Sequence, residues 1–134
     1  MRTIKFRAWN IQQQKMLEVS SLLFKDGVQV GTYNKVNVSP DHHYYPSDEN
    51  ILMQFTGLLD KKGVEIYEGD IIEAKPSNSR WNPLICKIVF NSENARFEAQ
   101  QYWVNKDKWI SLSNSHNYYE YKVIGNIHQN KYLL

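Results

Sequence analysis

The side chains that could do chemistry fall into four small groups along this chain of 134 residues. The most suggestive group interleaves basic and aromatic residues in the C-terminal half. Exposed rings can stack on nucleic-acid bases or pack against a partner protein, and nearby cations can bind anionic groups. We predict that this group forms an interaction surface, and its members are Arg80, Trp81, Arg96, Tyr102, Trp103 and Trp109.

The partner of this surface can be argued from charge and from strand geometry. Adjacent strand residues point to opposite faces, so at least one of Tyr102 and Trp103 can lie outside the core. Aromatic residues are also common in small cores and in subunit interfaces. The formal net charge is only +2, whereas affinity for nucleic acid depends mainly on neutralising phosphates. We therefore favour a protein partner and keep nucleic acid as the alternative.

The second group contains the adjacent residues His42 and His43, with Asp41, Asp48 and Glu49 nearby. Structural zinc sites usually use spaced pairs of cysteine and histidine. Adjacent histidines in an extended segment point to opposite sides and cannot easily share one ion. We therefore predict no metal site, and we interpret these residues as a solvated loop.

The third and fourth groups are Cys86 and the carboxylates of Glu65, Glu68, Asp70 and Glu73. Cys86 shares an alternating apolar face with Leu84 and Ile88, which predicts a buried thiol rather than a nucleophile. On a strand, Glu68 and Asp70 could face the same side, but acid–base catalysis also needs a pocket that separates their pKa values. We interpret these acids as a charged rim. Phosphate-binding glycine loops are absent, so we predict neither an enzyme nor a cofactor.

Composition indicates which elements must position these residues. Alanine occurs four times, whereas Trp (4), Tyr (9) and Phe (5) are abundant, and aromatic side chains favour strands. Apolar residues make up 42% and charged residues 22% of the chain, which excludes a disordered polymer. No apolar run approaches the roughly 18 residues of a membrane span, and the start does not resemble a signal peptide. We expect a mainly β protein of the cytoplasm.

The N-terminal part reads as hairpins followed by a loop. Within the strand predicted over 3–9, the apolar residues at 4, 6 and 8 alternate with the basic residues at 5 and 7, and residues 16–19 would return as the second strand of a hairpin. A second hairpin is predicted over 22–30, where Asp26-Gly27 suits a two-residue type I′ turn. Residues 39–50 contain two prolines and no apolar period, so they are predicted to be a loop that ends this part.

The C-terminal part reads as short strands joined by turns. Their spacing of about 8 to 12 residues is typical of a small barrel or sandwich. We predict a single domain over 1–134, made of N-terminal β hairpins and a loop over 1–50 and a small β barrel over 51–134. The predicted strands are 51–55, 84–90, 97–104, 109–112 and 118–127, with turns at 60–63, 91–94 and 105–108 and a loop at 75–83.

Three blocks of sequence resemble the YopX family of small phage and prophage proteins. They are the opening Met1-Arg2-Thr3-Ile4-Lys5-Phe6-Arg7-Ala8-Trp9, the central block from Leu52 to Ile72, and Val123-Ile124-Gly125-Asn126-Ile127-His128-Gln129-Asn130 near the end. The match spans nearly the whole chain. The family often has Asp at the place of Asn10 and Tyr-Glu-Asn-Pro at the place of residues 128–131.

The resemblance implies properties that the residues alone do not. It implies a phage or prophage origin, an SH3-like barrel in the C-terminal part, and self-association. It carries over no catalytic residue, because the family is not assigned a biochemical activity. We therefore expect a homo-oligomer in the cytoplasm of a bacterial host that binds a host or phage protein.

Overall fold

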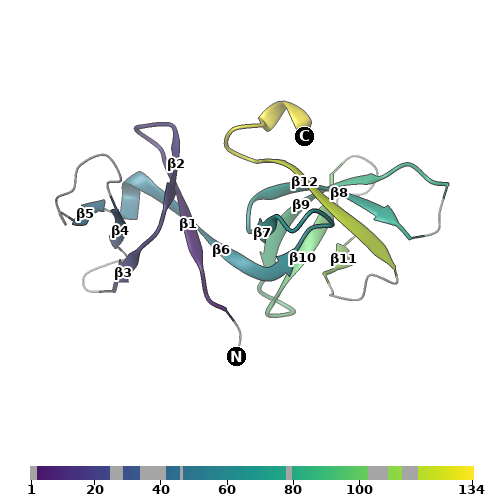
Figure 1. Cartoon of the computed structure of the whole chain (residues 1–134), viewed down its shortest axis with the longest axis horizontal. Coiled ribbons are helices and arrows are strands. Elements are labelled where there is room, and N and C mark those ends of the chain that lie inside the picture. Colours follow the sequence, from purple (N-terminus) through teal and green to yellow (C-terminus); the bar gives the residue numbers. More distant parts are fainter. Residues whose placement is uncertain are drawn as a thin grey trace. The chain divides into compact units, whose positions relative to one another are not determined.

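The computed structural model describes residues 3–24, 29–33, 42–45, 47–77, 80–102, 109–112 and 118–134. Within these ranges the regular elements are β-strands and two short 3-10 helices (Figure 1). The prediction of a mainly β fold is therefore confirmed. No helix in the described ranges is long and apolar enough to cross a membrane.

The chain forms two compact units, Thr3–Gln54 and Phe55–Leu134. The border falls inside the longest strand, β6 (Asn50–Leu59). The first half of β6 pairs with β1 (Phe6–Asn10), and its second half pairs with β7 (Glu65–Tyr67). The description of 1–134 as a single domain stays a prediction.

The first unit begins with the predicted hairpin. Strand β1 pairs with β2 (Lys15–Glu18), from Arg7 opposite Glu18 to Asn10 opposite Lys15, which confirms this hairpin. The turn is closed by the buried Asn10, whose side chain accepts the N–H of Gln13 at 2.7 Å and donates to Asn50 at 3.1 Å. Because Asn50 begins β6, one amide joins the hairpin turn to the neighbouring strand.

A three-stranded antiparallel sheet completes this unit. It contains β3 (Ser21–Leu23), β4 (Gln29–Tyr33) and β5 (His42–Tyr45). Pairing of β3 with β4 confirms the second hairpin, whereas its predicted Asp26-Gly27 turn lies outside the described residues. The small core of the unit contains Ala8, Leu17 and Val30.

The loop predicted over 39–50 is wrong for much of its length. Residues 42–45 form β5, the 3-10 helix η1 follows at Ser47–Glu49, and β6 already begins at Asn50. Strand β5 has no alternation of apolar and polar residues, but its main chain pairs with β4, from Val30 opposite Tyr45 to Tyr33 opposite His42. This strand therefore depends on its main-chain hydrogen bonds to β4, and a pattern of apolar residues in the sequence does not indicate such bonds.

The second unit is built on a curved five-stranded antiparallel sheet in the order β11-β10-β9-β8-β12 (Figure 1). These strands agree with the predicted succession, although β8 covers the first two residues of the loop predicted over 75–83 and β10 begins at Arg96. A curved sheet of this kind is compatible with a small barrel, and the SH3-like detail stays a prediction. The bounds are β8 Asp70–Pro76, β9 Leu84–Asn91, β10 Arg96–Gln101, β11 Trp109–Ser111 and β12 Tyr119–Asn126.

One face of this sheet carries the core of the second unit. Ile66 of β7 is fully buried and belongs to the same hydrophobic cluster as side chains of all five strands. The hairpin of β6 and β7 therefore supplies part of this core. The other buried members of the cluster are Ile72, Ala74, Cys86, Ile88, Ala99, Ile110 and Tyr121.

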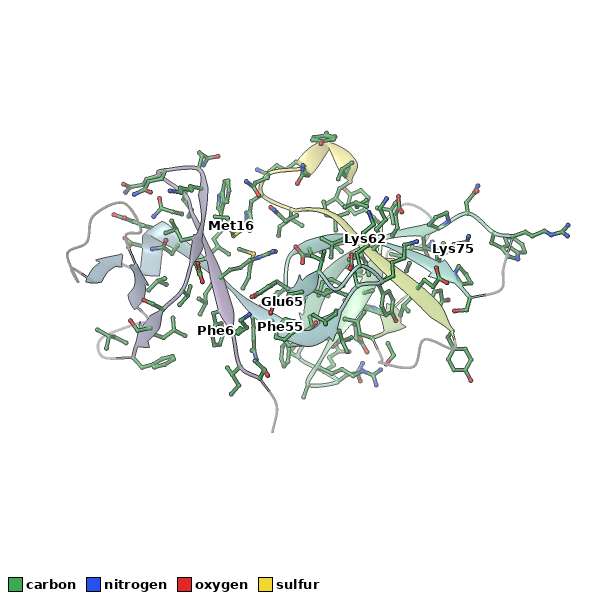
Figure 2. All side chains as sticks on the ribbon, viewed as in Figure 1. Phe6, Met16, Phe55, Lys62, Glu65 and Lys75 are labelled. Carbon is green, nitrogen blue, oxygen red and sulfur yellow. The ribbon has the colours of Figure 1, made fainter. Side chains whose placement is uncertain are left out.

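The turn between β6 and β7 is attached to the edge of β12. The buried carboxylate of Asp60 accepts N–H groups of Lys62 at 2.7 Å, Val64 at 2.9 Å and Val123 at 3.1 Å. The N–H of Lys61 also donates to the carbonyl of Tyr121 at 3.0 Å. Figure 2 shows Lys62 at this turn and Phe55 and Glu65 on the two strands of the hairpin. The predicted turn at 60–63 is confirmed, and it closes one edge of the sheet.

Candidate interaction surface

The face of the five-stranded sheet opposite the core, over β9, β10 and β11, is called the outer face below. Because Cys86, Ile88, Ala99 and Ile110 all belong to the core cluster, the residues that alternate with them point the other way. The strand register then fixes which outer-face residues are neighbours. They are Lys87 and Val89 on β9, Arg96, Glu98 and Gln100 on β10, and Trp109 and Ser111 on β11.

A cross-strand row of this face joins an aromatic ring, an amide and a cation. Gln100 lies opposite Lys87 on one side and opposite Trp109 on the other. Strands in a sheet are about 4.8 Å apart, so the row spans on the order of 10 Å. Trp109 is 41% exposed, and Lys87 takes part in none of the ion pairs formed among the described residues. The row thus presents an aromatic surface and a free ammonium group.

A second feature of the outer face is a buried carboxylate that holds an exposed guanidinium group. Nε and Nη2 of Arg96 each lie 2.6 Å from Oε1 of Glu98. Asn91 donates to Oε2 of Glu98 at 2.7 Å, and Asn94 donates to Oε1 at 3.3 Å. The Glu98 side chain is 2% exposed, whereas the Arg96 side chain is 54% exposed. One edge of the guanidinium group is therefore fixed, and the rest of it faces solvent.

These contacts also determine the charge of Glu98. Burial is the largest influence and raises its pKa, but the hydrogen bonds from Asn91, Arg96 and Asn94 and the charge of Arg96 together lower it below the ordinary value. Glu98 is therefore ionised at neutral pH. Its negative charge compensates Arg96, so Lys87 is the uncompensated cation of this part of the face.

Five of the six residues that the sequence placed in one surface lie in the part of the chain that the structure describes, and they lie on more than one element. Arg96 and Trp109 share the outer face, and Tyr102 directly follows β10, where its N–H continues the ladder to Ile85 at 3.2 Å. Arg80 and Trp81 lie instead in the connection between β8 and β9. Trp103 lies outside the described residues.

The connection between β8 and β9 has a surface feature of its own. Trp81 is 80% exposed, and with Arg80 and Asn82 it lines a shallow, open pocket of about 300 Å³. Among the described residues, those that line the pocket all belong to this connection, and the pocket is open to solvent. We treat the β8–β9 connection and the outer face as two separate features.

Lys87, Glu98 and Gln100 were not among the residues that the sequence predicted for this surface. The spacing of two residues between Arg96, Glu98 and Gln100 indicates a shared face, and it was available from the sequence. The pairing of Gln100 with Lys87 was not, because it joins β10 to β9 in a particular register. An aromatic residue and a cation that are adjacent in the sequence of a strand point to opposite faces of the sheet. Residues of one strand that share a face are two positions apart.

The comparisons with known proteins bear on nearly the whole chain. Residues 5–134 match the family described as YopX protein. The chain belongs to the YopX family. A crystal structure of the protein EF1440 from Enterococcus faecalis is similar, with 32% sequence identity and a TM-score of 0.69, covering 100% of this chain and 99% of that one. No curated protein matches significantly.

A second solved structure shows the same fold at lower sequence identity. It is the crystal structure of the protein yopX from Bacillus subtilis, with 21% identity and a TM-score of 0.65 over 100% of this chain and 99% of that one. The resemblance stated from the three sequence blocks is thereby confirmed for this member of the YopX family.

The remaining chemical groups of this YopX-family chain are placed as follows. Cys86 is fully buried, and burial raises the pKa of its thiol to about 11, which confirms its assignment to the core. Glu68 lies in the turn between β7 and β8 rather than on a strand. Asp70 is 1% exposed and accepts the N–H of Tyr67 at 2.8 Å, so its assignment to an exposed rim is wrong. The buried carboxylate of Asp70 therefore stabilises the turn between β7 and β8.

The candidate metal ligands were compared with the positions of the side chains that the structure describes. The described residues contain no group of three or more His, Cys, Asp or Glu side chains that could hold an ion. The backbone of His42 and His43 forms part of β5, and their side chains lie outside what the structure describes.

Proposed function

We propose that this YopX-family protein is a non-enzymatic β interaction protein encoded by a phage or prophage. It acts in the cytoplasm of the bacterial host, associates with copies of itself and binds a host or phage protein. The observation that carries the proposal is the outer face, where Trp109 and the guanidinium group of Arg96 are exposed on one sheet. Tryptophan and arginine are enriched among the residues that dominate the energy of protein interfaces.

A non-enzymatic role is supported by the way the buried ionisable groups are used. Asp60, Asp70 and Glu98 all accept hydrogen bonds from main-chain N–H groups or from Asn and Arg side chains. Cys86 lies within an apolar cluster. A catalytic acid, base or nucleophile needs access to a substrate and a pKa suited to proton transfer. These four groups instead stabilise turns, a hairpin and the core.

A protein partner is favoured over nucleic acid by the charge of the surface. Binding a nucleic-acid strand requires several cations that neutralise phosphates. On the outer face, Glu98 already compensates Arg96 and leaves Lys87 as the uncompensated cation. Nucleic acid bound by the residues of 80–109 remains the alternative proposal, and the experiment below separates the two.

The first test is size-exclusion chromatography with light scattering and paired absorbance at 260 and 280 nm on the purified full chain. We expect a mass that is a multiple of 15.9 kDa and a protein-like absorbance ratio. Affinity capture from a host lysate with cross-linking should then recover a specific protein.

Two results would count against the proposal. A monomer at every concentration that also captures no protein would remove both self-association and partner binding. An excess of absorbance at 260 nm that disappears in high salt would favour nucleic acid instead, because salt weakens phosphate contacts.

A further inference from the structure

We propose that the outer face of β9, β10 and β11 is the partner-binding site and that its occupant is an acidic segment of a partner protein. This inference rests on the proposed function and adds the location of the site and the chemistry of the ligand. In the complex, carboxylates of the segment bind Arg96 and Lys87, and an apolar or aromatic side chain packs on Trp109.

Arg96 is suited to this role because its geometry is fixed before binding. Glu98, Asn91 and Asn94 form a network in which Oε1 and Oε2 of Glu98 both accept hydrogen bonds. An arginine held by one edge loses little conformational entropy when the other nitrogens bind a ligand. The remaining N–H groups of a planar guanidinium match the two oxygens of a carboxylate.

Lys87 and Trp109 define the rest of the site. Both flank Gln100 in the register of the sheet, so the cation and the ring are separated by one strand. A bound segment that crosses β10 can therefore reach Lys87 with a carboxylate and Trp109 with an apolar side chain at once. Tryptophan offers a large contact area at small entropic cost, which is typical of residues that anchor interfaces.

Charge distinguishes an acidic protein segment from a polyanion. The outer-face residues of β9, β10 and β11 contain two cations, Lys87 and Arg96, and one acid, Glu98. Their sum is +1, which suits one or two carboxylates. A nucleic-acid strand carries one phosphate charge per nucleotide, so a net charge of +1 would neutralise little of it. The face therefore complements a short acidic segment.

The test uses a phage-displayed library of random 12-residue peptides, selected on the full-length protein. We expect the selected peptides to be enriched in Asp and Glu together with an aromatic or large apolar residue. Synthetic, fluorescently labelled copies of the strongest peptide then serve as the probe in anisotropy titrations. A labelled oligo-dT strand is titrated in parallel.

Two variants outside the Glu98 network test the site. Trp109→Ala and Lys87→Glu should each weaken binding of the selected peptide by about tenfold or more. Arg96→Lys, which keeps the charge but not the planar fork, should weaken it as well. Thermal unfolding of each variant shows whether it is folded, and Trp109→Ala at an exposed position keeps the test valid if Arg96→Lys is unstable.

The connection between β8 and β9 supplies matched controls. Trp81→Ala removes an exposed tryptophan and Arg80→Glu reverses an exposed cation, so they repeat the chemical changes away from the outer face. Their affinities for the peptide should stay within about twofold of wild type.

Several outcomes would overturn the inference. The first is a selection that yields no binder, or only peptides without carboxylates. The second is a peptide affinity that neither Trp109→Ala nor Lys87→Glu changes. Loss of binding in the Arg80 and Trp81 variants alone would leave the proposed function standing but move the site to the β8–β9 connection. Salt-sensitive binding of oligo-dT that requires Trp109 would assign the face to nucleic acid.

Discussion

Asp60 shows how one side chain can hold distant parts of the chain together. Its two carboxylate oxygens accept three main-chain N–H groups, two within the β6–β7 turn and one from Val123 of β12. Burial is the largest influence on its pKa and raises it, but these hydrogen bonds and the charge of Lys62 together lower the pKa below the ordinary value. The carboxylate is therefore a structural acceptor at neutral pH.

Replacing Asp60 with asparagine should destabilise the protein. In Asp60→Asn, one carboxylate oxygen becomes an amide NH₂ group that must face an N–H donor, so at least one buried donor loses its acceptor. The expected loss is about 1–3 kcal/mol in the free energy of unfolding, measured by urea denaturation. The control is Asp48→Asn in the exposed first turn of η1, which should change stability by less than about 0.5 kcal/mol. Equal effects of the two variants would refute the role given to Asp60.

At the residue scale, the sequence indicates which side chains are buried better than it indicates which residues contact one another. The burial of Cys86 follows from its alternation with Leu84 and Ile88, and the structure confirms it. The pairing of Arg96 with a buried Glu98 two residues later could have been suspected from the same alternation. The alternation does not indicate the degree of burial of Glu98, whose carboxylate accepts hydrogen bonds from the Asn91 and Asn94 side chains at the hairpin turn.

At the scale of the element, the end of β12 packs tightly against the turn that follows it. The main-chain N–H of Asn126 donates to Oδ1 of Asn130 at 3.1 Å, and the N–H of Asn130 donates to the carbonyl of Asn126 at 2.9 Å. The Asn126 side chain accepts the N–H groups of His128 and Gln129. Asn130 therefore lies directly over Gly125, which has no side chain.

The space at Gly125 gives a prediction for this element. A Cβ atom there would lie 2.5 Å from Oδ1 and 2.8 Å from Cβ of Asn130, so Gly125→Ala must displace the turn. We expect a loss of about 1–3 kcal/mol in the free energy of unfolding. In an Asn130→Gly background, the same substitution should cost at least about 0.5 kcal/mol less, as a double-mutant cycle would show. Strict additivity in that cycle would mean that the two residues do not collide.

Element boundaries show where local patterns mislead. The sequence places a strand at 51–55, whereas β6 extends from Asn50 to Leu59. Gly57 lies within it at a positive φ of 90°, between the pairs Phe55–Tyr67 and Leu59–Glu65 where the register shifts. Glycine in a sequence suggests a turn. Here it lies at an irregularity within a strand, because a bulge can also require an unusual backbone conformation.

At the scale of the whole molecule, two of the buried carboxylates, Asp60 and Glu98, predict how stability depends on pH. Asp60 and Glu98 both have a pKa below their ordinary values of 3.8 and 4.5. Between the folded and unfolded pKa values, the unfolded chain binds more protons than the folded one. Their contribution to stability is therefore complete above the ordinary values and is lost as the pH falls through the folded values.

Urea denaturation at constant ionic strength between pH 7 and pH 3 measures this dependence. The free energy of unfolding should fall as the pH drops below about 4.5. The decrease should be smaller in a variant that combines Asp60→Asn and Glu98→Gln, although that variant is less stable at pH 7. A wild-type decrease no steeper than that of the double variant would contradict the assignment of these two groups.

The sequence by itself determined the class of fold, the two N-terminal hairpins, the succession of strands from 84 to 126 and the burial of Cys86. Alternation and turn residues are properties of consecutive positions, so a single chain displays them directly. The three sequence blocks also determined the family.

Only the tertiary structure decided which of the predicted surface residues act together. Strand register joins Lys87, Gln100 and Trp109 across β9, β10 and β11 and leaves Trp81 in a separate connection. Pairing with β4 forms β5 from a segment without an apolar period, and the Asp60 carboxylate links the β6–β7 turn to β12. These features depend on hydrogen bonds between residues far apart in the chain, and no local pattern specifies such pairings.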